Sequence, residues 1–235
     1  MGLDWSKYPM AGSLREGIRL YRSKRWELAL NELLQVDPKN FDEEDNFELA
    51  YYLGLCYSKL ERYDDALLYL EQVVTSGSDP LRSYQCRMAL AYIYSITNRS
   101  KLAEFELKHL LEKGYESTQI YSALAYTAWA QKKFDPSIDW YKRALSLDSE
   151  NSTALNGLGY VLADTEKDIR KALVFCKKAV EKKPQNPAYL DSLGWAYFKN
   201  GELLEARTWL RRALDLAPSQ MEIRTHMKIV VGERA

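Results

Sequence analysis

Apolar residues recur along this chain at helical spacing, in pairs of short segments separated by a few polar residues. The stretch 187–219 shows the pattern most clearly, with Gly201 between two apolar stripes and Pro218 after the second. The stripes consist of Leu190, Leu193, Gly194 and Tyr197, then Ala206, Leu210 and Ala213. Spacings of three and four residues place each stripe on one face of a helix. Glycine favours a turn and proline ends a helix, so the pattern predicts a helical hairpin.

One small residue in each segment repeats with a regular period. The pairs are Gly17/Ala29, Gly54/Ala66, Ala91/Ala103, Ala125/Ser137, Gly159/Ala172 and Gly194/Ala206. Members of a pair are 12 or 13 residues apart, and successive pairs recur every 34 to 37 residues. Antiparallel helices cross closely only where neither carries a bulky side chain. Such a period therefore predicts an array of helical hairpins.

The order of residues in each period resembles the tetratricopeptide repeat family. The resemblance is strong in the periods that begin near Phe47, Ser152 and Pro187, and it covers six units in all. It implies an all-α solenoid of stacked antiparallel hairpins, forming a right-handed superhelix. We expect one array over 1–235, with repeats at about 10–41, 47–80, 84–117, 118–151, 152–186 and 187–220.

Both ends of the array depart from the regular pattern. Residues 221–231 form an amphipathic segment without a partner hairpin, and we expect them to be a helix that caps the array. The first unit ends early at Asp37-Pro38, and a longer connection over 37–45 is expected to follow. The acidic run 42–45 in that connection favours a helix N-terminus, with a docking site for a basic partner as the alternative.

Composition narrows the classes of partner. Lysine plus arginine (33) equals aspartate plus glutamate (33), so no net charge favours nucleic acid, and no apolar run predicts a membrane span. Three widely spaced cysteines and an N-terminus unlike a signal peptide predict a cytoplasmic protein. A periplasmic location is the alternative if the chain is a trimmed mature domain.

Residues for catalysis are sparse. The chain has two histidines, His109 and His226, with no partner at metal-ligand or catalytic-triad spacing. No glycine-rich phosphate-binding loop is present. We therefore expect a non-enzyme with no cofactor, no metal ion and no catalytic residue.

The family geometry points instead to a binding groove. The first helix of each hairpin lines the concave wall in tetratricopeptide repeats, and its inward positions here are rich in aromatic residues. The resemblance implies partner contacts at Tyr51, Leu55, Met88, Tyr92, Tyr126, Trp129, Asn156, Tyr160, Asp191, Trp195 and Phe198. Tyrosine and tryptophan are enriched at interfaces because they offer large contact areas with few rotors to freeze. Packing of these rings against neighbouring helices, or against the cap, is the alternative.

We therefore predict a protein-interaction scaffold or adaptor whose groove takes an apolar or aromatic-bearing segment of a partner protein. Inward lysines and asparagines that clamp carboxylate tails in some family members are missing, which argues against an acidic C-terminal peptide. One alternative is self-assembly into a homo-oligomer through Trp5, Tyr8 and Trp26 of the first unit. Another is an accessory subunit of an enzyme or of an envelope or motility complex. The repeats resemble those of bacterial members of the family, many of which work in such complexes.

Overall fold

The computed structural model describes residues 12–76 and 79–232, and these contain thirteen α-helices and no strand. They divide into two compact units, one ending at Leu110 and the other beginning at Leu111. The first unit contains α1 (Gly12–Arg22), α2 (Trp26–Leu34), α3 (Glu43–Lys59), α4 (Tyr63–Ser76), α5 (Pro80–Ile96) and most of α6 (Ser100–Glu112). The second contains α7 (Thr118–Ala130), α8 (Phe134–Leu147), α9 (Ser152–Asp164), α10 (Ile169–Lys182), α11 (Pro187–Lys199), α12 (Leu203–Leu216) and α13 (Met221–Val231).

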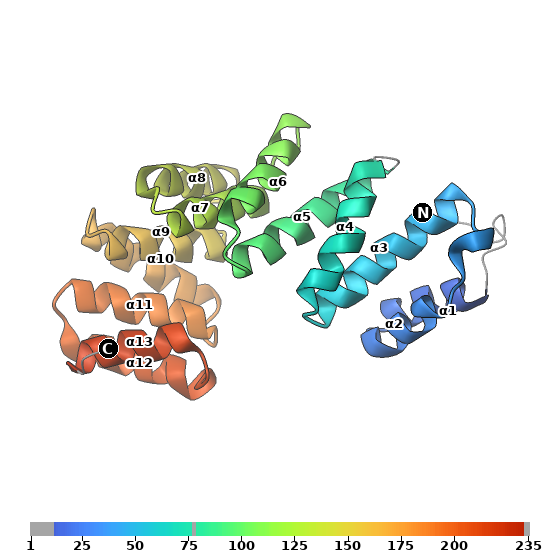
Figure 1. Ribbon diagram of the computed structural model, residues 1–235. Coiled ribbons are helices and arrows are strands. Elements are labelled where there is room, and N and C mark those ends of the chain that lie inside the picture. Colours follow the sequence, from blue (N-terminus) through green and yellow to red (C-terminus); the bar gives the residue numbers. More distant parts are fainter. Residues whose placement is uncertain (1–11, 77–78, 233–235) are drawn as a thin grey trace. The chain divides into compact units, whose positions relative to one another are not determined.

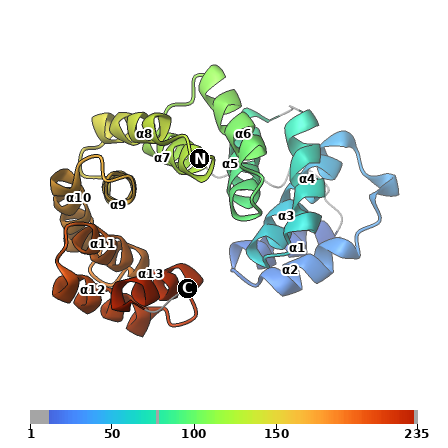
Figure 2. The same cartoon turned by 60° about the vertical axis from the view of Figure 1, so that its left-hand side comes forward.

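Successive helices pair as antiparallel hairpins, as the sequence predicts, and the all-α fold is confirmed. In the second unit, Figures 1 and 2 show α7/α8, α9/α10 and α11/α12 stacked in chain order, with α13 beside α11 and α12. The predicted cap has the predicted bounds, 221–231. The single array over 1–235 stays a prediction.

The small residues lie where the paired helices cross. Gly17, Gly54 and Gly194 lie on first helices, and each approaches a leucine of the second helix: Leu33, Leu70 and Leu210, respectively. Each leucine comes four residues after the small residue of its own helix. The alanines of the pairs are fully buried or nearly so. Gly201, in the last hairpin turn, has a φ of +85°. The other hairpin turns place a non-glycine residue at positive φ: Lys24, Glu61, Asn98, Lys132 and Glu166. The turn geometry is thus common to all hairpins, although glycine marks it only once.

The expected connection over 37–45 is three residues too long, and the helix N-terminus expected at its acidic run is confirmed. The connection before α3 ends at Asp42, because Asp42 caps the helix through a 2.8 Å bond from the Asp45 backbone N–H. Residues 43–45 therefore form the first turn of α3, where negative charge is favourable. Trp26 is only partly exposed, and the Lys59 amine lies 6.0 Å from its ring centre. Trp5 and Tyr8 lie outside the described residues.

In the compact unit that ends at Leu110, the repeats are longer, and two of their first helices are longer too. α3 and α5 have 17 residues, whereas α7, α9 and α11 have 13. Asp79 caps α5 through bonds to the N–H groups of Leu81 and Arg82, and Pro80 occupies the first turn, where its missing N–H is not needed. The additional residues thus extend these helices by a turn ahead of the crossing position.

The three cysteines, Cys56, Cys86 and Cys176, are free thiols in the interior. Burial raises the pKa of Cys56, Cys86 and Cys176 to about 12. At pH 8 only roughly one thiol in ten thousand would then be ionised, and the thiolate is the nucleophile.

We therefore expect the folded protein to resist a thiol reagent such as Ellman's reagent at pH 8. All three thiols should react once guanidinium unfolds the chain, because their pKa then returns to the ordinary range. Absorbance of the released chromophore measures both reactions. Rapid labelling of any cysteine in the native protein would contradict the burial.

Candidate functional site: an aromatic hollow in the second unit

A hollow of about 190 Å³ lies against the first helices α7, α9 and α11 of the second unit. Its lining residues are Tyr126, Trp129, Tyr141, Asn156, Gly157, Tyr160, Val161, Ala188, Asp191, Ser192, Gln220, Glu222 and Ile223. Five of the sequence-predicted contact residues are among them: Tyr126, Trp129, Asn156, Tyr160 and Asp191. The hollow is therefore built largely from the positions that the family resemblance turns inward.

The floor of the hollow depends on a glycine. A Cβ atom at Gly157 would lie 2.2 Å from Cζ of Tyr141, so only a residue without a side chain lets this ring pack against α9. Tyr141 comes from the second helix α8 and is buried, and burial raises the pKa of its hydroxyl. Sequence reasoning missed Tyr141 as a lining residue, because it assigned second helices to the core alone.

Aromatic rings follow one another along this surface. Tyr126 and Trp129 have ring centres 5.7 Å apart, and Trp129 meets Tyr160 edge to face at 5.5 Å. The Trp129 indole N–H lies 3.5 Å from Oδ2 of Asp164, and the Trp195 indole N–H donates to Oδ1 of the same carboxylate at 3.2 Å. Asp164 thus contacts the indole rings of two neighbouring residues in space, Trp129 of α7 and Trp195 of α11. The sequence analysis did not predict this role.

Helix α13 covers the C-terminal part of this surface. Its buried residues are Ile223, His226 and Val230, at the i, i+3 and i+7 positions of one face. Nδ1 of His226 lies 2.9 Å from both carboxylate oxygens of Asp191, and the imidazole stacks on Trp195 with ring centres 4.3 Å apart. The cap is therefore fixed to α11 by a buried polar pair and a stacked pair of rings.

Glu222 of α13 reaches the edge of the hollow. Its carboxyl interacts with the Tyr160 hydroxyl, and the residue is exposed to solvent. Burial, then the charge of Asp191, raises the pKa of Glu222, and His226 partly offsets this rise. Burial and the neighbouring carboxylates, Asp164 first, raise the pKa of the Tyr160 hydroxyl.

The predicted contact residues differ in how much surface they offer. Tyr126 is 45% exposed, Tyr92 of the first unit is 56% exposed, and Tyr160 is partly exposed. The others with partial exposure are Leu55, Met88, Trp129, Asn156 and Phe198. Tyr51, Asp191 and Trp195 are buried, so they present little surface to a partner in this structure. Their role as contacts stays a prediction.

The cap residues that line the hollow, Gln220, Glu222 and Ile223, were not predicted as site residues. A signal for the packed face was present in the sequence, because Ile223, His226 and Val230 share one helical face. What the sequence did not show is that this face lies against the same first helices that form the hollow.

These features define a class: a helical-hairpin repeat protein with an aromatic surface on its first helices. The family model described as Tetratricopeptide repeat matches residues 14–81 and 122–187, and a second model of the same description matches 187–220. The matches cover more than half of the chain. It belongs to the tetratricopeptide repeat family.

Known proteins that resemble the chain agree with this. The TPR repeat-containing protein PA4667 of Pseudomonas aeruginosa is 37% identical over 83 residues, which is 35% of this chain and 14% of that protein. A crystal structure of a tetratricopeptide repeat protein from Parabacteroides merdae has a TM-score of 0.70 at 13% identity, over 93% of this chain and 83% of that one. YrrB, described as a TPR protein with an unusual peptide-binding site, has a TM-score of 0.54 at 18% identity, over 77% of this chain and 91% of its own. The chain spans 14% to 31% of the length of the curated relatives it matches.

None of the helices within 12–76 and 79–232 combines the length and apolar character that crossing a membrane requires.

Proposed function

We propose that this chain is a non-catalytic protein-interaction scaffold that binds an apolar or aromatic-bearing segment of a partner protein along the first helices of its second unit. The observation that carries the proposal is the partly exposed row of Tyr126, Trp129 and Tyr160 beside the hollow. Burying one such ring contributes about 1.5–3 kcal/mol before the costs of association. The peptide-binding site described for YrrB supports the same use of this fold.

Helix α13 indicates how a partner segment would lie. It packs an apolar stripe, Ile223 to Val230, against α11 and α12. A helix laid in a groove uses anchors at such spacings. The partner segment would occupy the neighbouring surface that α13 leaves open, at Tyr126, Trp129 and the exposed part of Tyr160. Asn156 would fix its register, and the half-buried Phe198 would extend the contact.

A random peptide library displayed on phage supplies the probe for a test. Peptides selected on the wild-type protein should bind the double variant Tyr126→Ala/Tyr160→Ala at least tenfold more weakly, because each substitution removes a contact ring. Fluorescence polarisation of the synthetic peptides measures the Kd, and circular dichroism checks helicity.

The control is Val174→Ala/Leu204→Ala, which removes two exposed apolar side chains from the second helices α10 and α12. It should leave the Kd unchanged. Equal binding by both double variants, with intact helicity, would reject this surface as the binding site. Self-assembly, the accessory-subunit role and the cytoplasmic or periplasmic location stay predictions.

A further inference from the structure

We propose that the hollow in the second unit receives a cationic side chain, lysine or arginine, of the bound segment. The inference rests on the proposed function and names the side-chain chemistry that the site recognises. It is carried by three features of the lining: aromatic walls, carboxylates with no lysine or arginine among the lining residues, and a buried acceptor without a donor.

The walls are the rings of Tyr126, Trp129 and Tyr160. Trp129 lies between the other two, tilted by 37° to Tyr126 and by 75° to Tyr160, so the rings enclose a space rather than form one flat stack. A cation within about 6 Å of an aromatic ring is attracted by the negative face of the ring, and tryptophan attracts it most. An ammonium or guanidinium group in the hollow would meet such faces on more than one side.

The charge around the hollow is negative. Glu222 and Asp191 are among the lining residues, and no lysine or arginine is found among the described residues that line it. Nδ1 of His226 lies 2.9 Å from the Asp191 carboxylate, whereas Glu222 interacts with the Tyr160 hydroxyl. Lys199, near Trp195, pairs with Glu166 at 2.7 Å. The raised pKa of Glu222 has crowding with Asp191 as its second cause after burial, and a bound cation would relieve that crowding.

Asn156, one of the residues that line the hollow, also carries a buried acceptor. Oδ1 of Asn156 is buried, and no described group donates a hydrogen bond to it. Leaving a buried polar atom without a partner is unfavourable. Lysine and arginine carry several N–H donors and no acceptor, so they suit a site that offers acceptors only. An aliphatic side chain would leave Asn156 without a donor, and an acidic one would be repelled by Asp191 and Glu222.

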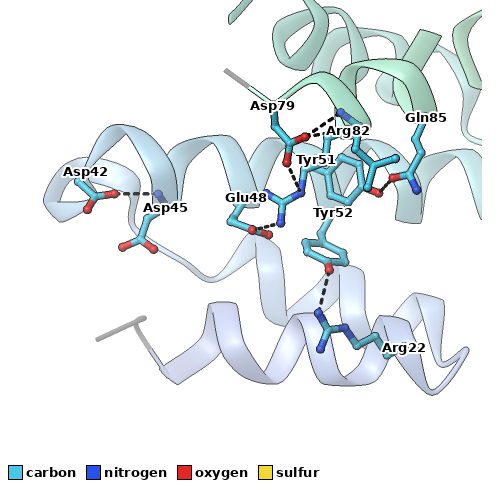
Figure 3. A network of polar contacts seen from close by, with 10 residues as sticks. Arg22, Asp42, Asp45, Glu48, Tyr51, Tyr52, Asp79, Arg82 and Gln85 are labelled. Carbon is cyan, nitrogen blue, oxygen red and sulfur yellow. Dashed lines mark hydrogen bonds and ion pairs between the residues drawn. The ribbon is translucent and has the colours of Figure 1, made fainter. Parts of the chain in front are cut away.

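In the first unit, an arginine of the chain itself lies among aromatic rings and carboxylates. The Arg82 guanidinium lies 5.6 Å from the ring centre of Phe47 and 5.2 Å from that of Tyr51, and it forms ion pairs with Glu48 and with Asp79 (Figure 3). This chain thus places one of its own cations between aromatic rings and carboxylates. The hollow of the second unit offers the same two kinds of group without a cation from the chain.

The test uses two small probes with the same four-carbon side chain, N-acetyl-lysine methylamide and the neutral N-acetyl-norleucine methylamide, which lacks the terminal amine. Each is titrated into the full chain, and the indole N–H signal of Trp129 is followed by NMR, assigned among the six tryptophans with Trp129→Phe. The lysine probe should shift this signal at concentrations at least tenfold lower than the norleucine probe. Glu222→Gln should weaken lysine binding about fivefold to tenfold, and Glu181→Gln, on the exposed face of α10, should not.

Equal shifts by the two probes, no shift by the lysine probe, or full lysine affinity in Glu222→Gln would each overturn the inference. These outcomes are separable from those of the phage experiment. Peptides that depend on Tyr126 and Tyr160 but contain no lysine or arginine would keep the binding groove and reject the cation site. Lysine binding without any selected peptide would keep the cation site and reject the groove.

Discussion

Replacing Gly159 with valine should lower the free energy of unfolding of the second unit by about 3 kcal/mol, because the substitution overpacks the crossing of α9 and α10. A Cβ atom at this position would lie 2.5 Å from Sγ of Cys176, 3.1 Å from the backbone N of Cys176 and 3.1 Å from the carbonyl oxygen of Ala172. Two of these contacts are to backbone atoms, so a side-chain rotation cannot relieve them. Urea denaturation followed by circular dichroism measures the change.

Two variants separate overpacking from other effects of valine. Ala130→Val, at the exposed C-terminal residue of α7, reports the lower helix propensity of valine and should change stability by less than about 1 kcal/mol. Gly159→Val/Cys176→Ala removes the sulfur but keeps the backbone contacts, so it should recover only part of the loss. A Gly159→Val protein as stable as the wild type would mean that these helices do not cross at this residue.

Replacing Asp191 with alanine should cost about 2–3 kcal/mol of stability and loosen α13. The substitution leaves the buried His226 imidazole without its partner, and a buried polar group that loses its hydrogen bond is costly. Asp191→Asn keeps an acceptor oxygen and should cost less. Hydrogen exchange of the α13 amides, together with urea denaturation, measures both effects.

A double-mutant cycle isolates the pair. His226→Leu keeps a side chain of similar bulk against Trp195, and combining it with Asp191→Ala should cost less than the sum of the two single changes by at least 1 kcal/mol. Additive losses would show that the two side chains do not stabilise one another. The cycle matters for function because α13 brings Glu222 to the hollow.

Most of the hairpin architecture follows from local pattern. Gly194 and Ala206 mark a helix crossing whatever surrounds them, because only small residues let two helix axes approach so closely. The acidic run 42–45 likewise predicted a helix N-terminus, although the sequence analysis counted it within the connection before α3. The acidic residues 43–45 are compatible with a connection and with a helix N-terminus, and the Asp42 cap decides for the helix.

The site was predictable only in part. Tyr126 and Trp195 occupy the same inward position of their repeats, yet the first is 45% exposed and the second is 7% exposed. The difference arises because the His226 imidazole stacks on Trp195. Position within a repeat gives the direction of a side chain, but the element that packs over it decides whether it meets solvent.

The spacing of small and apolar residues, on its own, determined the hairpins, their number and the cap helix, because helix periodicity and close helix crossing are properties of neighbouring segments. The tertiary structure decided which aromatic rings are free and which groups surround them. Glu222 and His226 lie more than sixty residues beyond Tyr160, and they meet it because α13 folds back onto the first helices. The electrostatic character of the hollow arises from that contact between distant segments.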